Sequence, residues 1–369
     1  MKIAFYINAI HEGGAERVMV NLANAFVNKG DEIILITSFK DTWEYPYSDK
    51  IKRYILEVKP TKNSKFKRNI IRVFELRKIL KEEKPDCLIS FMAEANYRGI
   101  IASLGLNNKV IISVRNDPNV EYRGAIGKVL GKFLLPLADG CVFQTLDAQK
   151  WFPKRLQKKS KIIYNAVKDE FFNIERNVEK NTVVTCGRLE KQKNHKLLIN
   201  AFEIVLYKHP DARLLIFGEG SLRHELEDLI KNKNLNRNIK LCGNSNDIPK
   251  ILSNAEIFVL SSNYEGMPNA LMEALAAGVP SISTNCPCGG PEMLIKNHEN
   301  GILINVGDIF ELSKSISYLL DFKKISREIG YRAKKRALEF KSNKIYNEWY
   351  EYINDFKVVE NYQGDILWI

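Results

Sequence analysis

The chain has 369 residues, of which 45% are hydrophobic and 27% are charged, as in an ordinary globular protein. That length accommodates two domains with hydrophobic cores of their own. No apolar run reaches the ~18–20 residues of a membrane-spanning helix, and the first residues lack the pattern of a signal peptide. Six scattered cysteines suit a reducing compartment, so we expect a cytoplasmic protein.

The net charge of +12 resides in the first half of the chain. Residues 1–169 contain 30 Lys and Arg against 18 Asp and Glu, whereas residues 170–369 contain 26 of each kind. Such a one-sided excess of cations indicates an anionic partner for the first half. A membrane surface, a phosphorylated substrate and a nucleic acid all satisfy this criterion.

The hydrophobic pattern alternates between strand-like and helix-like segments in two successive blocks. The first block predicts strands at Ile3–Asn8, Glu32–Thr37, Cys87–Phe91, Val110–Val114 and Gly140–Gln144, and helices at Ala15–Lys29, Lys65–Glu83, Ala95–Leu104 and Gly124–Leu137. The second predicts strands at Thr182–Cys186, Leu214–Phe217, Ile239–Leu241, Ile257–Leu260 and Ser281–Thr284. Short apolar strands separated by helices predict doubly wound parallel sheets, so the expected fold class is α/β.

This alternation gives a first domain over residues 1–165 and a second over residues 181–342. Residues 166–180 are polar and irregular and are expected to form a hinge. Residues 343–369 are expected to contain a terminal helix, because Tyr346, Trp349 and Ile353 recur at helical spacing. Tandem α/β domains bind ligands at the carboxyl ends of their strands, in the cleft between them.

The stretch from Ser261 to Pro280 is the most informative about function. It follows an apolar strand, and Pro268 suits the first turn of the helix that comes next. Glu265 is thus expected in a strand-to-helix loop and Glu273 on the helix. The helix N-terminus favours a phosphate, and carboxylates accept hydrogen bonds from hydroxyls, so the pattern indicates a sugar-nucleotide site. The alternative is that both glutamates are solvated.

The run E-G-M-P-N-A-L-M-E-A-L-A-A-G-V-P, from Glu265 to Pro280, resembles the Glu-x7-Glu signature of retaining GT-B glycosyltransferases of glycosyltransferase family 4. The resemblance implies two Rossmann-like domains that face a central cleft, with the donor held by the second domain. It assigns Glu265, as a catalytic residue, to hydroxyls of the transferred sugar and Glu273 to the ribose hydroxyls. The same run implies further donor-binding residues, namely Gly266, Met267, Pro268 and Asn269.

A basic loop, G-R-L-E-K-Q-K-N-H from Gly187 to His195, follows the first strand of the second domain. It resembles the family's G-R-L-x-x-x-K-N element. Breaking a sugar–phosphate bond leaves negative charge on the departing diphosphate, and fixed cations stabilise that charge without a metal. Arg188 and Lys193 are therefore predicted to be catalytic, unless the loop is simply solvated. The sequence has no Asp-x-Asp triplet, so we expect neither a metal nor another cofactor.

Three weaker motifs match the family in the expected order. Gly13 and Gly14 follow the first strand in a run that resembles the Gly-Gly-Ala-Glu loop facing the donor diphosphate and the acceptor, which makes Glu16 an acceptor-side candidate. Gly218 and Glu219 resemble the turn beside the nucleotide. For these residues an ordinary tight turn is the alternative.

The third weak motif, Asp247 with Ile248, resembles the loop that frames the nucleobase.

Near the cleft, many family members carry a histidine that contacts the donor sugar, whereas this chain has Arg115-Asn116-Asp117. Arg115 and Asp117 are candidates for selecting the sugar or the acceptor, with a structural turn as the alternative. Cys286 and Cys288 depart from the family pattern, and without a second pair of ligands they do not indicate zinc.

The resemblance covers nearly the whole chain. It implies a retaining enzyme that moves a hexose or N-acetylhexosamine from a UDP-sugar to a growing glycan, carried on a polyprenyl diphosphate at the inner face of the cell membrane. One alternative is a GT-B enzyme with a soluble acceptor, which the basic first half disfavours. The other is a non-enzymatic nucleic-acid-binding protein, which explains the charge but leaves the Glu-x7-Glu run without a purpose.

The basic charge is densest between Lys50 and Lys84, which hold 13 Lys and Arg against four Glu. An apolar stripe at helical spacing is expected to pack on the first domain; its members are Phe66, Ile70, Val73, Phe74, Arg77 and Leu80. Lys65, Arg68 and Arg72 lie off that stripe. They are expected to face outward and bind an anionic membrane or the diphosphate of the acceptor, unless they form a merely solvated face.

Overall fold

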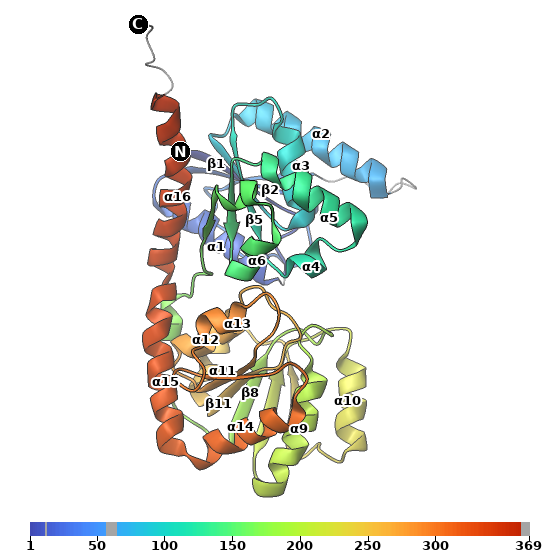
Figure 1. The fold of residues 1–369 in the computed structure, drawn as a ribbon, viewed down its shortest axis with the longest axis vertical. Helices are drawn as coiled ribbons and strands as arrows, with labels where there is room; N and C mark the ends of the chain where they lie inside the picture. The colour runs from blue at the N-terminus through green and yellow to red at the C-terminus, as the bar shows by residue number, and fades with distance from the viewer. Residues whose placement is uncertain (12, 57–64, 363–369) are drawn as a thin grey trace, which may run out of the picture. The chain divides into compact units, whose positions relative to one another are not determined.

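The computed structural model describes residues 1–11, 13–56 and 65–362 (Figure 1). By its internal contacts the chain divides into two units, the first made of Met1–Asn165 with Ile345–Ile369 and the second of Ala166–Lys344. Each unit contains one parallel sheet flanked by helices, which confirms the predicted α/β fold class. Within the described ranges, no helix combines the length and hydrophobicity needed to cross a bilayer.

The first unit, as far as it is described, has a parallel sheet in the order β3-β2-β1-β4-β5-β6-β7. Its strands are β1 (Lys2–Ile7), β2 (Glu32–Thr37), β3 (Lys52–Ile55), β4 (Cys87–Phe91), β5 (Lys109–Val114), β6 (Gly140–Phe143) and β7 (Ser160–Ile162). Its helices are α1 (Gly14–Asn28), α2 (Lys65–Glu83), α3 (Ala93–Ser103), α4 (Pro118–Glu121), α5 (Gly124–Phe133), α6 (Leu146–Trp151) and α7 (Lys154–Gln157), with a 3-10 turn, η1, at Leu135–Leu137.

The central strands of this sheet are apolar along their whole length because helices cover both of their faces. Every residue of β4 is buried, and so is every residue of β1 and β5 after the first. In the parallel register, Ala4 of β1 pairs with Ile34 of β2 and Leu88 of β4. The strands therefore end together at one edge of the sheet.

The second unit has a parallel sheet in the order β10-β9-β8-β11-β12-β13. Its strands are β8 (Thr182–Cys186), β9 (Arg213–Phe217), β10 (Ile239–Gly243), β11 (Ile257–Leu260), β12 (Ser281–Thr284) and β13 (Ile302–Ile304). Its helices are α8 (Asp169–Phe172), α9 (His195–Lys208), α10 (Arg223–Asn232), α11 (Ile248–Asn254), α12 (Asn269–Ala276), α13 (Gly290–Leu294), α14 (Ile309–Asp321) and α15 (Lys323–Ala337), with a 3-10 turn, η2, at Leu338–Phe340.

The core of the second unit joins sheet and helices. Ile216 of β9, Phe202 of α9 and Ile316 of α14 are fully buried in one cluster. From β8 the chain adds β9 and β10 on one side of the strand and β11 to β13 on the other. The carboxyl ends of β8 and β11 consequently flank the point where strand order reverses, which is where open α/β sheets bind ligands.

The terminal helix α16 (Ser342–Tyr362) begins in the second unit and packs on the first. Trp349 is 1% exposed, and its ring lies 5.8 Å from that of Phe91 at the end of β4. The hydroxyl of Tyr352 accepts a hydrogen bond from the Cys141 N–H (2.9 Å) and donates one to the Lys159 carbonyl (2.6 Å). Side chains of α16 thus pack against residues of β4 and β6.

The structure differs from the sequence prediction mainly in its short elements. Strands β3, β7 and β13 were not predicted, and residues 166–180, expected as an irregular hinge, belong to the second unit and contain α8. Three or four residues are too few to show a period in the sequence, so only pairing with a neighbouring strand reveals them.

Replacing Trp349 by Ala should lower the free energy of unfolding of the first unit by about 3–5 kcal/mol, because a large buried aromatic side chain leaves a cavity. Urea unfolding followed by tryptophan fluorescence and circular dichroism measures the change. Glu351→Ala, which removes an exposed side chain from the same helix, is the control. A Trp349 variant as stable as this control would show that α16 does not anchor the unit.

Candidate active site

Two loops of the second unit meet at the point where strand order reverses. One follows β8 and contains Lys193, and the other follows β11 and contains Glu265. The ammonium of Lys193 lies 2.5 Å from Oε1 of Glu265, and the Ser262 hydroxyl donates to the same oxygen at 2.6 Å. Because Glu265 is only 5% exposed, this ion pair compensates a carboxylate that has lost most of its water.

Further hydrogen bonds tie the same two loops. Gln192 donates through its side-chain amide to the Tyr264 carbonyl (3.0 Å), and the Ser261 hydroxyl donates to the Lys193 carbonyl (2.9 Å). Each bond joins the loop after β8 to the loop after β11. The orientation of the Lys193–Glu265 pair is therefore set by backbone contacts on both sides, and not by the two long side chains alone.

The start of α9 holds the basic loop in place. Asn194 adopts a left-handed conformation (φ 46°) and caps the helix by accepting a hydrogen bond from the Leu197 N–H (3.3 Å). His195 is buried, which lowers its pKa to about 4, and its Nε2 lies 3.2 Å from the Arg188 carbonyl. The neutral ring fixes the backbone of Arg188, while the Arg188 side chain itself is exposed.

Glycines allow the neighbouring loops to approach closely. Gly218, after β9, has φ +137°, and a Cβ there would lie 2.1 Å from the Gly187 carbonyl. A Cβ on Gly290 would lie 1.7 Å from the Gly266 carbonyl. Side chains at Gly218 and Gly290 would therefore push apart the loops that follow β8, β9, β11 and β12.

Helix α12 begins directly after the loop that contains Glu265, with Pro268 at its N-cap, and Gly278 (φ +69°) follows its end. Glu273 lies on this helix and is 7% exposed. Its charge contributes, after burial, to raising the pKa of Cys186 at the end of β8, so the carboxylate lies close to that strand. The structure thus rejects the alternative that both glutamates are solvated.

In the first unit, the loop after β1 leads into α1 with Gly13 at the N-cap. A Cβ on Gly13 would lie 1.7 Å from Oε2 of Glu16, so the Glu16 carboxylate folds back over this residue. Gly14, the first residue of α1, is exposed.

Arg115, at the end of β5, is buried with few neutralising partners. It donates to the side-chain oxygen of Asn165 (2.5 Å), and its guanidinium lies 4.5 Å from the ring centre of Phe91. Burial lowers the pKa of Arg115 to about 9, although Glu121 and then Glu16 favour the charged form. The guanidinium therefore remains a cation at neutral pH.

Comparison with known proteins identifies the family. Residues 12–171 match the family described as Glycosyltransferase Family 4, and residues 167–336 match Glycosyl transferases group 1. The chain is 30% identical, over 97% of its length and 99% of the relative's, to the GalNAc-alpha-(1->4)-GalNAc-alpha-(1->3)-diNAcBac-PP-undecaprenol alpha-1,4-N-acetyl-D-galactosaminyltransferase of Campylobacter jejuni. The chain belongs to glycosyltransferase family 4.

Two further matches extend over nearly the whole transferase. The N-acetylgalactosamine-N,N'-diacetylbacillosaminyl-diphospho-undecaprenol 4-alpha-N-acetylgalactosaminyltransferase of C. jejuni is 28% identical over 95% of this chain and 99% of its own. Anabaena Alr3699/HepE, solved in complex with UDP and glucose, superposes with a TM-score of 0.80 at 17% identity, over 96% of this chain and all of its own. The last match shows the GT-B fold, and the family membership excludes a non-enzymatic nucleic-acid-binding protein.

Other residues of the transferase that were predicted to bind the donor have structural contacts. Asp247 is the exposed N-cap of α11 and accepts a hydrogen bond from the Lys250 N–H (3.1 Å), next to the half-buried Ile248. Glu219 forms an ion pair with Arg223 (2.6 Å). Both lie in loops at the carboxyl end of the sheet. These contacts do not test their predicted binding roles, which remain predictions.

The other donor-site predictions fall in the loop before α12. Gly266, Met267 and Pro268 are buried, and Asn269 is half-buried at the start of the helix. In the first unit, Asp117 is the N-cap of the short helix α4 and accepts from the Asn119 N–H (2.8 Å). This contact supports the structural alternative for Asp117.

The prediction for α2 was wrong in part. Leu80 is buried and Val73 packs against the core, as predicted, but Ile70 and Phe74, also expected to be buried, are exposed. Leu76 and Ile79, which lie outside the predicted stripe, pack in the core instead. Arg72 is half-buried: burial, and then the charge of Arg98, lower its pKa, and its Nε has no hydrogen-bond partner among the described residues.

Arg68 is also half-buried, and the side chain of Lys65 lies outside the described part of the structure. The three residues were expected to share one outward cationic face. For Arg72 that expectation fails, because the packing of α2 turns this position toward the end of β1.

A buried polar cluster surrounds Arg98 of α3 at the ends of β1 and β2. Its guanidinium donates to Asn8 (2.7 Å), Ser38 (3.1 Å) and the Tyr6 hydroxyl (3.0 Å). It also pairs with Glu94 at 2.5 Å. Sequence reasoning missed this cluster because isolated Arg, Ser and Asn positions are usually exposed and give no periodic signal.

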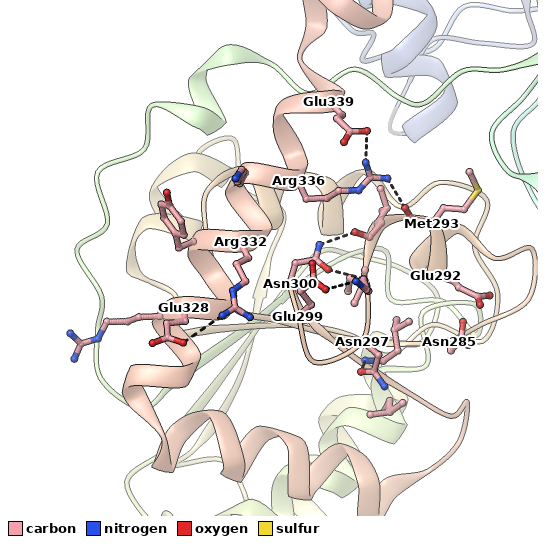
Figure 2. A pocket seen from close by; sticks show the side chains of 18 of the residues that line it. Asn285, Glu292, Met293, Asn297, Glu299, Asn300, Glu328, Arg332, Arg336 and Glu339 are labelled. Carbon is pink, nitrogen blue, oxygen red and sulfur yellow. Dashed lines mark hydrogen bonds and ion pairs between the residues drawn. The ribbon is translucent and has the colours of Figure 1, made fainter.

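A large pocket lies elsewhere on the second unit and has a volume of about 1480 Å³ (Figure 2). Two of its arginines have local partners: Arg336 donates to the Met293 carbonyl (3.0 Å) and pairs with Glu339, and Arg332 pairs with Glu328 (3.8 Å). None of the predicted site residues lines this pocket. We therefore do not assign it to the transfer reaction.

The cysteines do not form a paired motif. None of the six forms a disulfide bond, and burial raises the pKa of Cys286 to about 12, with a smaller contribution from Glu265. Cys288 has a positive φ of 73°. The structure gives no functional explanation for the two cysteines of this loop.

Glu121 is a second residue that the sequence did not reveal. Its Oε1 accepts a hydrogen bond from the Ala93 N–H at the start of α3 (2.6 Å), and burial raises its pKa to about 7. Because this exceeds the ordinary value of 4.5, its contribution to stability is greatest at pH below about 4.5 and is lost as the pH rises through about 7.

Glu121→Gln should therefore stabilise the transferase at pH 8 by on the order of 1–3 kcal/mol and have little effect at pH 5. The amide keeps an oxygen for the Ala93 N–H but cannot ionise. Thermal unfolding across this pH range measures the difference. An equal effect at both pH values would show that the carboxyl does not titrate in this range.

Proposed function

We propose that the transferase moves a hexose or N-acetylhexosamine from a UDP-sugar to a glycan carried on a polyprenyl diphosphate, with retention of the α configuration. The observation that carries this proposal is the constellation of Glu265, Lys193 and Glu273 at the strand-order reversal of the second unit. Two buried carboxylates, one of them paired with an ammonium, lie beside the start of a helix.

The donor fits this arrangement group by group. Glu273 would accept hydrogen bonds from the ribose hydroxyls, and Glu265 from hydroxyls of the transferred sugar. The N–H groups at the start of α12 suit the diphosphate. UDP is favoured because the structural relative HepE is solved in complex with UDP and glucose.

Retention is supported by the names of the C. jejuni relatives, which specify alpha linkages. Transfer from an α-linked UDP-sugar to give an α product retains the configuration. The Glu265 carboxylate already accepts hydrogen bonds from Lys193 and Ser262. A carboxylate with these partners is better suited to orienting hydroxyls than to acting as a nucleophile. Reaction on one face of the sugar, with the leaving diphosphate assisting deprotonation of the acceptor, therefore needs no covalent intermediate.

The departing diphosphate acquires negative charge as the sugar bond breaks. Arg188 is exposed at the end of β8 with its backbone held by His195, and Lys193 follows in the same loop. These two cations would stabilise the leaving group without reorganising, which is the most effective form of electrostatic catalysis.

A lipid-linked acceptor is supported by both C. jejuni relatives, whose names describe undecaprenyl-diphosphate glycans. In the first unit, Arg98 and Arg72 lie close enough for the charge of one to lower the pKa of the other, and Arg68 adds to this effect. Three guanidiniums near one acidic partner, Glu94, suit an acceptor diphosphate. The enzyme would then work at the inner face of the membrane.

Glu273→Ala should weaken UDP binding by roughly 10- to 100-fold, because the ribose hydroxyls lose a charged acceptor worth about 1.5–3 kcal/mol. Glu265→Ala should mainly lower kcat. Isothermal titration with UDP and turnover of a UDP-sugar panel separate the two effects. Unchanged UDP affinity in the Glu273 variant would contradict the ribose assignment, and no turnover of any UDP-sugar would contradict the proposed function.

Transfer should survive excess EDTA, while Arg188→Ala should lower kcat by roughly 10²–10³-fold, by analogy with losing one oxyanion donor. Lys191→Ala, which removes an exposed cation from the same loop, is the matched control and should have little effect. Initial rates of UDP release measure both. A strict requirement for Mg²⁺ would contradict the leaving-group assignment, as would equal rates for the Arg188 and Lys191 variants.

A further inference from the structure

The loop that follows β2 exposes two large aromatic side chains. Trp43 is 50% exposed and Phe39 is 38% exposed. The ring of Trp43 lies 5.0 Å from that of Tyr45, and the two rings meet edge to face at an angle of 70°. Exposed aromatic rings gathered in one loop leave in water an apolar surface that a bound ligand would cover.

Backbone hydrogen bonds fix this loop to the rest of the first unit. The Phe39 N–H donates to the Asn8 carbonyl (3.1 Å), and the Tyr45 N–H donates to the Ile10 carbonyl (2.9 Å). Both acceptors belong to the segment between β1 and Gly13. The rings are therefore held in place before a ligand arrives, which reduces the entropy lost on binding.

A second anchor of the loop is Arg53 of β3. Its guanidinium donates to the Glu44 carboxylate at 2.9 Å and to the Thr37 hydroxyl at 2.8 Å. The same group lies 5.5 Å from the ring centre of Tyr47. The side chain of Glu44 is only 13% exposed, so this residue is directed toward the arginine, while its neighbour Trp43 is left in solvent.

The loop lies at the edge of the sheet where α/β proteins bind ligands. Strands β1 and β2 pair in parallel, so the segments that follow them lie at the same carboxyl edge. From β1 the chain adds β2 and β3 on one side and β4 to β7 on the other, so β1 adjoins the reversal of strand order. Ser38 accepts a hydrogen bond from Arg98 (3.1 Å). The loop thus begins beside the arginine group proposed for the acceptor diphosphate.

Polar groups beside the rings suit a hydroxylated ligand. Oδ1 of Asp41 accepts a hydrogen bond from the Thr42 N–H (2.7 Å), and Oδ2 lies 3.5 Å from Nδ1 of His11. The side chains of His11 and Asp41 are 39% and 37% exposed, and the ring of His11 lies 6.4 Å from that of Phe39. A carboxylate and an imidazole both form hydrogen bonds with hydroxyls.

The charge of the loop narrows the choice of ligand. Residues 39–49 contain one Lys against two Asp and one Glu, although the first half of the chain carries the net positive charge. Local acidic charge disfavours an anionic bilayer or a phosphate, and it does not disfavour a neutral ligand. A pyranose ring is neutral, carries hydroxyl groups and presents a face of C–H groups that packs against aromatic rings.

We propose that Trp43, Phe39 and Asp41 form a subsite for one pyranose ring of the acceptor glycan, which we call the aromatic subsite. The Trp43 ring packs against the C–H face of the sugar, and Asp41 accepts hydrogen bonds from its hydroxyls. This deepens the proposed function, on which it rests for the nature of the acceptor. Binding that is equal in the ground state and the transition state acts on KM and not on kcat.

Binding of free sugars tests the aromatic subsite without any transfer reaction. The probes are soluble disaccharides of glucose, galactose, N-acetylglucosamine and N-acetylgalactosamine, added to protein saturated with UDP and followed by saturation-transfer nuclear magnetic resonance and calorimetry. Trp43→Ala should lower the affinity for the tightest-binding disaccharide by roughly tenfold. Trp43→Tyr keeps an aromatic ring and should lower it by less than about threefold.

Tyr207→Ala is the matched control, since Tyr207 is 87% exposed on the second unit, and it should bind the disaccharide like the wild type. Equal affinities of the Trp43→Ala and Tyr207→Ala variants would overturn the proposal, as would a wild type that binds none of the disaccharides. Asp41→Asn keeps an oxygen for the Thr42 N–H but loses the charge, so it should weaken binding by about three- to tenfold. Unchanged affinity in this variant would overturn the part assigned to Asp41.

Kinetics separate the aromatic subsite from the donor site and from lipid binding. Trp43→Ala should raise the KM for a glycan acceptor by roughly tenfold, and it should leave kcat, UDP affinity and vesicle binding unchanged. Weaker UDP binding would show that Trp43 stacks on the nucleobase, and weaker vesicle binding would show that it contacts lipid. Either result would overturn the proposal. If no UDP-sugar were turned over, the proposed function would fail, whereas disaccharide binding would still decide the subsite.

Discussion

The ion pair between Lys193 and Glu265 is the interaction on which the site of the second unit depends. It closes the point where strand order reverses, between the loops that follow β8 and β11. Both side chains are largely removed from solvent, so removing one partner would leave a buried charge at a cost of about 3–5 kcal/mol. Three further side chains, those of Ser262, Gln192 and Ser261, hold the two loops in the positions that the ion pair requires. The close approach that glycines allow between neighbouring loops contributes to the same arrangement.

The parallel sheets, and the loop and helix that carry Glu265 and Glu273, could be predicted because each depends on local sequence. Buried parallel strands are continuous apolar runs, and the proline before α12 and the glycine after it mark its ends. The pairing of Glu265 with Lys193 could not be predicted, since it joins residues 72 positions apart through the order of the strands. Strands as short as β13 depend on a neighbour in the same way.

The first unit shows where helical periodicity fails. Between residues 66 and 80 the apolar side chains of α2 cover more than one face, so the sequence permits several orientations. Packing against the core selects Leu76, Ile79 and Leu80, which turns Arg72 toward Arg98 and leaves Phe74 in solvent. The basic charge noted in the sequence is thereby divided between a half-buried arginine group at the strand ends and exposed lysines on α2 and α5.

The two units combine, in the account that we propose, a donor site built from loops and a first unit fitted to a lipid-linked acceptor. The central claim is retention during transfer from a UDP-sugar to that acceptor. Nuclear magnetic resonance of the product formed from UDP-N-acetylgalactosamine and a polyprenyl-diphosphate-linked glycan tests it most directly. The account predicts a new linkage with the α configuration of the donor, and a β linkage in the product would contradict it.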